Sequence, residues 1–198
     1  ETGEAPRHAI LEFFAKNLIV YDYLGSAPLK KILESCQYAV SKYGVSNIII
    51  DSVARTDLDI EDNQKANEFM DKIVTSMNET QAHYHLVAHA KKSSRHPETS
   101  RESIPNKQDI KGSGSIPVLA TNIIAVWRNQ MKENILKSDQ KKIPKEEVEK
   151  WDDAVLAIRK QKLTGEIGEF KLFFNKACRR FRRARERKDY PYKPADPF

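Results

Sequence analysis

Two ionisable side chains stand where short apolar runs end, which are positions suited to ligand chemistry. Asp51 comes directly after Ile48–Ile50, and His89 follows Leu86–Ala88. Apolar runs of this length, bounded by polar residues, predict strands that are buried on both faces of a parallel sheet. Because ligands of open α/β sheets bind at the carboxyl ends of the strands, we expect Asp51 and His89 to be neighbours on one rim.

Each of the two side chains has a structural and a functional interpretation. A carboxylate at a strand end commonly caps the next turn, whereas the functional alternative for Asp51 is to hold Mg²⁺ on a bound nucleotide. A single strand-end histidine such as His89 is more often a hydrogen-bonded structural residue than a sensor of ligand. The two residues alone leave these alternatives open.

Helices are expected to position this rim. Ser26 is a candidate N-cap with Pro28 in the first turn, and Gly44 is expected to end the helix that follows. Cys36 lies on the apolar stripe of that helix and is therefore expected in the core. Apolar residues at helical spacing predict helices over Pro6–Lys16, over 29–43 and over 66–77.

Strands are expected between and after these helices. The run Leu18–Tyr21 predicts a strand, so residues 18–51 are expected to form a β-α-β unit with a right-handed crossover. Phe170–Phe174 alternates enough to suggest a half-exposed edge strand, the last of the sheet. Further strands are expected at Tyr84–Ala88, Thr121–Trp127 and Ala154–Ile158.

Three polar segments separate or follow these strands. Residues 91–111 are basic and poor in apolar residues, which is typical of a functional loop or of disorder. The charged excursion 130–153 is expected to be partly helical around Pro144–Trp151. The arginine-rich tail from Arg179 has two interpretations, a solvated mobile segment or a contact surface for phosphate backbones.

Composition limits the class of protein. The chain has 198 residues, of which 39% are hydrophobic and 31% charged, and this suits a single domain with a real core. No apolar run reaches the length of a membrane span, so we expect no membrane partner. Cys36 and Cys178 match no metal-binding spacing and favour a reducing, cytosolic type of compartment.

Positive charge is concentrated in the second half of the chain. Residues 1–90 carry 8 Lys and Arg against 13 Asp and Glu, a net charge of −5, whereas residues 91–198 carry 26 against 15, a net charge of +11. Solubility does not require such a division, so the second half is a candidate surface for a polyanion. Nucleic acid is the expected polyanion.

The ordered series of these features resembles a known family. A strand with Asp51, a strand with His89, a basic loop, Gly112-Ser113-Gly114, a strand with Arg128 and a basic cluster before Thr164 follow one another. This order is similar to the RecA-like motor domain of DnaB-type hexameric replicative helicases, particularly the phage primase-helicases related to mitochondrial Twinkle. The resemblance covers Leu18 to about Phe181.

The resemblance implies a fold and a division of the chain. The expected fold is α/β, with a RecA-like, mostly parallel sheet flanked by helices, of which this chain carries only a part. Residues 1–178 would form the partial motor domain, including the charged insertion 130–153. Residues 179–198 would form a basic, flexible C-terminal tail.

The resemblance also implies roles for residues of the nucleotide site. Asp51 matches the Walker B position that helps to hold Mg²⁺, and His89 takes the position that senses the γ-phosphate and passes its presence to the DNA-binding loop. Arg128 and Phe174 match positions that flank the nucleotide base, where a guanidinium and an aromatic ring can stack on it. For Phe174 alone, core packing is the competing interpretation.

The segment Asp109–Gly114 matches the junction between the central DNA-binding loop and the helix behind it. Glycines in such a junction let backbone N–H groups approach phosphates closely. The residues that the resemblance implies for nucleic-acid binding are Lys91, Lys92, Arg95, Lys107, Lys111, Gly112, Ser113 and Gly114.

The chain departs from the family at the residues that act across the subunit interface. Family members carry Lys-x-Arg directed at the neighbouring γ-phosphate, whereas this chain has Lys160, Gln161 and Lys162. A lysine supplies charge but not the planar fork of a guanidinium. Three alternatives stay open: Lys162 works less efficiently, Arg159 contributes, or the protein hydrolyses ATP poorly.

A second departure is that no G-x-x-x-x-G-K-[ST] phosphate loop occurs in the chain. We therefore expect the C-terminal part of a longer replicative helicase, inactive as an ATPase on its own. The resemblance implies ATP and Mg²⁺ as cofactors, and as partners single-stranded DNA, identical subunits in a hexameric ring and a linked primase domain. It also implies a cytoplasmic location, that of the bacterial host if the origin is a phage.

Two other functions remain as alternatives at this point. One is a RecA-like recombination or regulatory ATPase without unwinding activity. The other is a non-catalytic nucleic-acid-binding protein that uses the basic half of the chain on a decayed motor fold.

Overall fold

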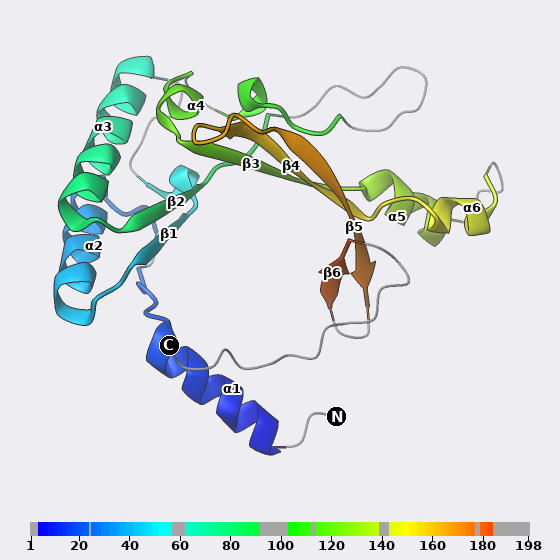
Figure 1. Cartoon of the computed structure of the whole chain (residues 1–198), viewed down its shortest axis with the longest axis horizontal. Coiled ribbons are helices and arrows are strands. Elements are labelled where there is room, and N and C mark those ends of the chain that lie inside the picture. Colours follow the sequence, from blue (N-terminus) through cyan, green and yellow to red (C-terminus); the bar gives the residue numbers. More distant parts are fainter. Residues whose placement is uncertain are drawn as a thin grey trace.

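The computed structural model describes residues 4–23, 25–56, 62–91, 103–111, 114–138, 143–176 and 179–183. Figure 1 shows two helices packed beside a small sheet at one end, a longer twisted sheet in the middle and two short helices at the other end. The helices are α1 (Glu4–Asn17), α2 (Leu29–Tyr43), α3 (Asn63–Thr80), α4 (Ser115–Leu119), α5 (Gln130–Lys137) and α6 (Lys145–Glu149), with short 3₁₀ turns η1 (Val53–Arg55) and η2 (Lys107–Asp109). The strands are β1 (Asn47–Asp51), β2 (His83–Val87), β3 (Asn122–Arg128), β4 (Ala154–Gln161), β5 (Gly168–Asn175) and β6 (Arg180–Arg182).

β1 and β2 form a two-stranded parallel sheet, as the two apolar runs predict. Helices α2 and α3 lie against one face of this sheet (Figure 1). Cys36 packs against the resulting core, which confirms its predicted position, and burial raises the pKa of its thiol. The buried core residues are Leu29, Ile48, Ile50, Val53, Phe69, Met70, Ile73, Ala82 and Ile116.

The ends of α2 and α3 follow local capping rules. Gly44 ends α2 in the left-handed conformation, with φ 66°, and donates its N–H to the Val40 carbonyl, as predicted. Asp62 caps α3, because its Oδ1 accepts the N–H groups of Gln64 and Lys65 at 2.9 and 3.2 Å. Ser26 is not the N-cap of α2: Pro28 holds that position without a side-chain hydrogen bond, so the prediction for Ser26 is wrong.

The second face of the parallel pair is open, contrary to the expectation of strands buried on both faces. Ile48 and Ile50 are buried, but Ile49 between them is 68% exposed. Residues 18–21 form no strand, and Val20 is 74% exposed, so the predicted β-α-β unit over residues 18–51 is wrong. An apolar run needs a hydrogen-bonded neighbour and a covering layer to become a buried strand, and within the described ranges β1 pairs with β2 alone.

β3 to β6 form a four-stranded antiparallel sheet in sequential order. Trp127, Val155 and Ala157 form a second core on one face, where Ile104 of the incoming loop packs against them. The other face is open at Val126, which is 71% exposed. Among the strands of the described residues, parallel pairing is confined to β1 and β2, and an isolated parallel bridge joins Ala27 to Thr56.

Two predictions about the end of this sheet need correction. β5 lies between β4 and β6, so it is an inner strand and not the edge that was expected. The basic segment expected to be a flexible tail begins with strand β6, because Phe181 pairs with Phe174 across the β5–β6 ladder. Residues 184–198 lie outside the described residues.

The insertion between β3 and β4 contains helices α5 and α6: α6 confirms the helix predicted around Pro144–Trp151, whereas α5 was not predicted. α5 begins directly after β3 and α6 precedes β4, so the insertion leaves and rejoins the sheet at one end (Figure 1). Within the part of the chain that the structure describes, no helix is long and apolar enough to cross a membrane.

Candidate functional site

Asp51 and His89 lie at the same rim of the parallel sheet, as the strand order predicts. Asp51 is paired in register with Val87, the last residue of β2, and His89 lies two residues beyond the end of that strand. Both side chains are exposed. The peptide bond between Asp51 and Ser52 is cis.

Asp51 has the donor chemistry that Mg²⁺ takes at nucleotide sites. Mg²⁺ is usually held there by one or two carboxylates, several waters and the phosphates of the substrate, and not by a closed protein cage. Among the residues that the structure describes, no three His, Cys, Asp or Glu side chains cluster as a metal site. An exposed single carboxylate therefore fits a metal that is shared with phosphates.

A pocket of about 450 Å³ opens beside His89, and we refer to it as the rim pocket. Three of its lining residues, His89, Lys91 and Lys111, carry nitrogen donors. Lys91 and Lys111 bring positive charge to this part of the rim, which favours an anion nearby. The residues that line it are Val53, Ala54, Ala88, His89, Ala90, Lys91, Lys111 and Ile116.

The returning end of the basic loop is fastened to the strand end that carries His89. Lys91 donates its N–H to the Asp109 carbonyl at 2.6 Å, and Lys111 donates its N–H to the His89 carbonyl at 2.8 Å. Asp109 ends the 3₁₀ turn η2, which is stabilised by a capping box of Asn106 and Asp109. A displacement of His89 therefore acts directly on the backbone of Lys111.

The basic cluster of β4 approaches the same loop. The Lys160 ammonium donates hydrogen bonds to the carbonyls of Pro117 and Val118, at 2.7 and 2.8 Å, at the end of α4. Desolvation lowers the pKa of Lys160, with smaller contributions from the charges of Lys162 and Lys107. Lys107 of the loop and Lys162 are thus both near enough to Lys160 for their charges to lower its pKa.

The three basic residues of this cluster differ in their availability. The Arg159 guanidinium donates to the Pro105 carbonyl at 2.9 Å and pairs with Glu169 at 2.8 Å. Lys160 is engaged with α4, as described above. The Lys162 side chain is exposed and makes no hydrogen bond or ion pair within the described part of the chain. The geometry favours Lys162 over Arg159 as the cation that can act on a neighbouring molecule.

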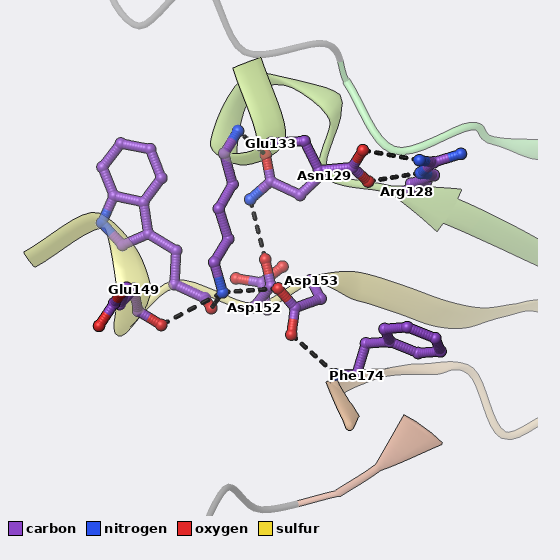
Figure 2. Close-up of polar contacts among 9 residues, drawn as sticks. Arg128, Asn129, Glu133, Glu149, Asp152, Asp153 and Phe174 are labelled. Carbon is purple, nitrogen blue, oxygen red and sulfur yellow. Dashed lines mark hydrogen bonds and ion pairs between the residues drawn. The ribbon is translucent and has the colours of Figure 1, made fainter. Parts of the chain in front are cut away.

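Arg128 and Phe174 project from one face and one end of the antiparallel sheet. Arg128 is opposite Ala154, which is opposite Leu172, so all three side chains point the same way. Phe174 is two residues beyond Leu172 and shares that face. Figure 2 shows the Arg128 guanidinium and the Phe174 ring on the same side of a polar network.

The contacts of these two residues leave the Phe174 ring accessible. Phe174 is 40% exposed, and its ring centroid lies 5.1 Å from that of Phe181, so core packing does not account for it. The Arg128 guanidinium makes a bidentate pair with Glu133, at 2.5 and 2.6 Å. This hydrogen-bonded pair lowers the pKa of Glu133.

The network in Figure 2 contains residues that the sequence interpretation missed. Asn129 is buried; its Oδ1 accepts the N–H of Lys132 and its Nδ2 donates to the Asp152 carbonyl. The ammonium of Lys132 pairs with Asp153 at 2.6 Å. An Asn directly before a run of helix formers was a signal for the Asn129 cap. Nothing in the sequence marked Lys132 as buried.

Several predicted nucleic-acid contacts cannot be placed in this geometry. Lys92, Arg95, Gly112 and Ser113 lie outside the described residues. Gly114 is described and holds the N-cap position of α4.

Comparison with known proteins gives one family match and a shared fold. A family model described as the DnaB-like helicase C terminal domain matches residues 7–183. Among solved structures, the chain is similar to a DnaB-like replicative helicase described with its interactions with primase, with TM-score 0.60 and 17% identity over 86% of this chain and 38% of that one. It is also similar to a second solved structure, described as an ATPase domain, with TM-score 0.60 and 18% identity over 88% of this chain and 57% of that one.

The structural matches confirm the expected α/β fold of RecA type. At identities of 17% and 18%, these structural matches are evidence for the fold alone. The chain spans less than two thirds of the length of either solved chain. No curated protein matches the sequence.

Proposed function

This chain belongs to the family of DnaB-like helicase C-terminal domains, and on that premise we propose that it is part of an ATP-driven motor that translocates on single-stranded DNA and unwinds duplexes. The observation that carries the proposal is the rim of the parallel sheet. There a strand-end carboxylate, a strand-end histidine and the end of a basic loop lie together, and backbone hydrogen bonds join the loop to the histidine.

Each residue of the rim has a role in the proposed motor. Asp51 would hold Mg²⁺, which would supply positive charge that neutralises the phosphates. His89 donates a hydrogen bond toward the γ-phosphate from the edge of the rim pocket. Because Lys111 is bonded to the His89 carbonyl, a change in the position of His89 moves the loop that grips DNA. The grip itself is supplied by Lys91, Lys107 and Lys111 through contacts with backbone phosphates.

The remaining parts of the proposed motor come from identical neighbouring subunits in a hexameric ring. Lys162, exposed beside Lys160, reaches the γ-phosphate held by the adjacent subunit and stabilises the charge of the transferring group. Arg128 and Phe174, which we call the base clamp, hold the nucleotide base between a guanidinium and an aromatic ring. A primase domain linked to the same polypeptide is a further proposed partner.

The phosphate cradle of this motor has to be supplied from outside these 198 residues, because the chain contains no Walker A sequence. The test therefore uses a polypeptide in which these residues are joined to their phosphate loop. We expect ATP hydrolysis stimulated by single-stranded DNA, and we expect Asp51→Ala to reduce it to background. The control is Asp71→Ala, which removes an exposed carboxylate on α3. This variant should hydrolyse ATP normally. Full activity of Asp51→Ala would refute the Walker B role.

One alternative function is favoured by a specific observation, the net charge of +11 over residues 91–198 together with the missing phosphate loop. A protein that only binds nucleic acid needs the positive charge but needs no phosphate loop. It would bind single-stranded DNA without any effect of nucleotide. A strand-displacement assay on a forked substrate also separates the helicase from a recombination or regulatory ATPase without unwinding activity.

A further inference from the structure

Two adjacent residues of α5 reach the two members of the base clamp by separate routes. Lys132 and Glu133 lie in the first turns of this helix, inside the insertion 130–153. Glu133 contacts Arg128 directly, whereas Lys132 reaches Phe174 through Asp153. Figure 2 shows the pair of Glu133 with Arg128 and the contact of Asp153 with Phe174.

The route through Lys132 begins at a buried side chain and continues to Asp153, whose side chain is partly exposed. The Lys132 side chain is 6% exposed, and its ammonium pairs with Asp153 at 2.6 Å. It also donates hydrogen bonds to the Trp151 and Glu149 carbonyls, at 2.7 and 3.2 Å. All the hydrogen-bond donors of this charged group therefore have partners, as a buried ammonium requires.

Asp153 continues this route into β5. Its Oδ1 pairs with Lys132, while its Oδ2 accepts the backbone N–H of Phe174 at 2.7 Å. Its own N–H donates to the Leu172 carbonyl at 2.9 Å. Two contacts from one residue thus set the position of the β5 backbone from which the Phe174 ring projects.

The route through Glu133 is shorter and exposed. Its two carboxylate oxygens accept from Nε and Nη2 of Arg128, a geometry that fixes the plane of the guanidinium. Arg128 has a side-chain exposure of 67%, so without Glu133 the guanidinium would sample several orientations.

We propose that α5 is a positioning element for the nucleobase, in which Glu133 orients Arg128, and Lys132, through Asp153, fixes the backbone of Phe174. The inference rests on the proposed function of Arg128 and Phe174 as the base clamp. It assigns a role to the insertion 130–153: discrimination of the base of a nucleoside triphosphate, separate from the phosphate chemistry at Asp51. Lys132, Asp153 and Glu133 are positioning residues that do not touch the base.

The experiment compares a ligand with a base and a ligand without one. Dissociation constants for ATP and for tripolyphosphate are measured on the phosphate-loop-containing ATPase that includes these residues. Glu133→Gln and Asp153→Asn are each expected to weaken ATP binding by about fivefold and to leave tripolyphosphate binding unchanged. Asp153→Asn should have no further effect on ATP binding in a Phe174→Ala background.

The insertion offers a matched control. Glu146→Gln, on the exposed side of α6, removes the same negative charge without touching either route and should leave both constants unchanged. Glu133→Gln alters an exposed pair, so it decides the question even if a variant of the buried pair fails to fold. Equal weakening of ATP and tripolyphosphate binding, or no change in either, would overturn the positioning role. If Arg128→Ala and Phe174→Ala leave ATP binding intact, the base clamp itself is refuted together with the inference.

Discussion

The basic side chains at the end of β4 and directly after it show how contacts distinguish residues that look alike in sequence. Lys160 and Lys162 are two positions apart, yet Lys160 donates to two carbonyls at the end of α4 while Lys162 is exposed. A cation that already has partners holds the fold together, and one without them is available to a second subunit. The proposed charge across the subunit interface therefore belongs to Lys162.

This division predicts opposite results for two matched substitutions. In the phosphate-loop-containing ATPase, Lys162→Ala should lower kcat by about 10²-fold or more and leave the melting temperature unchanged. Lys160→Ala should lower the melting temperature, because the Pro117 and Val118 carbonyls lose their donor. Steady-state hydrolysis and thermal denaturation measure the two effects. If Lys162→Ala hydrolyses ATP normally, the role across the interface is wrong.

The Arg128–Glu133 pair predicts a pH dependence of stability. Arg128 lowers the pKa of Glu133 in the folded protein below its ordinary value of 4.5. The pair therefore stabilises the fold fully above about pH 4.5, and this contribution is lost as the pH falls through the lowered folded pKa. The stability advantage of the wild type over Glu133→Gln, followed by urea denaturation, should shrink below pH 4.5. An advantage that does not change with pH would contradict the pairing.

At the scale of elements, the rim depends on a loop end that is fastened to a strand end. Lys91 and Lys111 are far apart in sequence, and the hydrogen bonds with Asp109 and His89 bring both to the rim pocket. The sequence predicted that both lysines serve nucleic acid, but not that they would share a pocket with His89. That information lies in backbone pairing between segments, which residue types do not encode.

Loss of these two lysines should change the salt dependence of DNA binding. If each contacts one phosphate of a single strand, the double variant Lys91→Ala/Lys111→Ala should reduce the slope of log K against log salt by about 1.4, at about 0.7 per contact. Fluorescence anisotropy with a labelled oligonucleotide, measured over a range of salt, gives the slope. Lys30→Ala/Lys31→Ala on α2 is a control with the same change of charge. An unchanged slope in the rim variant would place the DNA elsewhere.

Elements whose determinants are local were predictable, and those that need distant partners were not. Gly44 ends α2 and Cys36 packs in the core because capping and helical periodicity act within a few residues. Leu18–Tyr21 has the composition of a strand but remains exposed, because its burial depends on layers that the described residues do not provide. The buried Lys132 was missed because its partner Asp153 is 21 residues away.

At the scale of the whole molecule, both sheets have one covered and one open face. Ile49 on the parallel pair and Val126 on the antiparallel sheet are 68% and 71% exposed. The Asp51 rim and the base clamp lie at ends of these sheets and face outward. Such an arrangement suits a domain that completes its sites with phosphate-binding residues and with neighbouring subunits, which is how the proposed motor would work.

In the proposed motor, the His89 strand end couples the bound nucleotide to the DNA-binding loop. The most direct test is the rate of ATP hydrolysis with and without single-stranded DNA, in the phosphate-loop-containing ATPase and in its His89→Ala variant. We expect the variant to keep its rate without DNA and to lose the stimulation by DNA. Stimulation of the variant as large as that of the wild type would show that His89 does not couple the two sites.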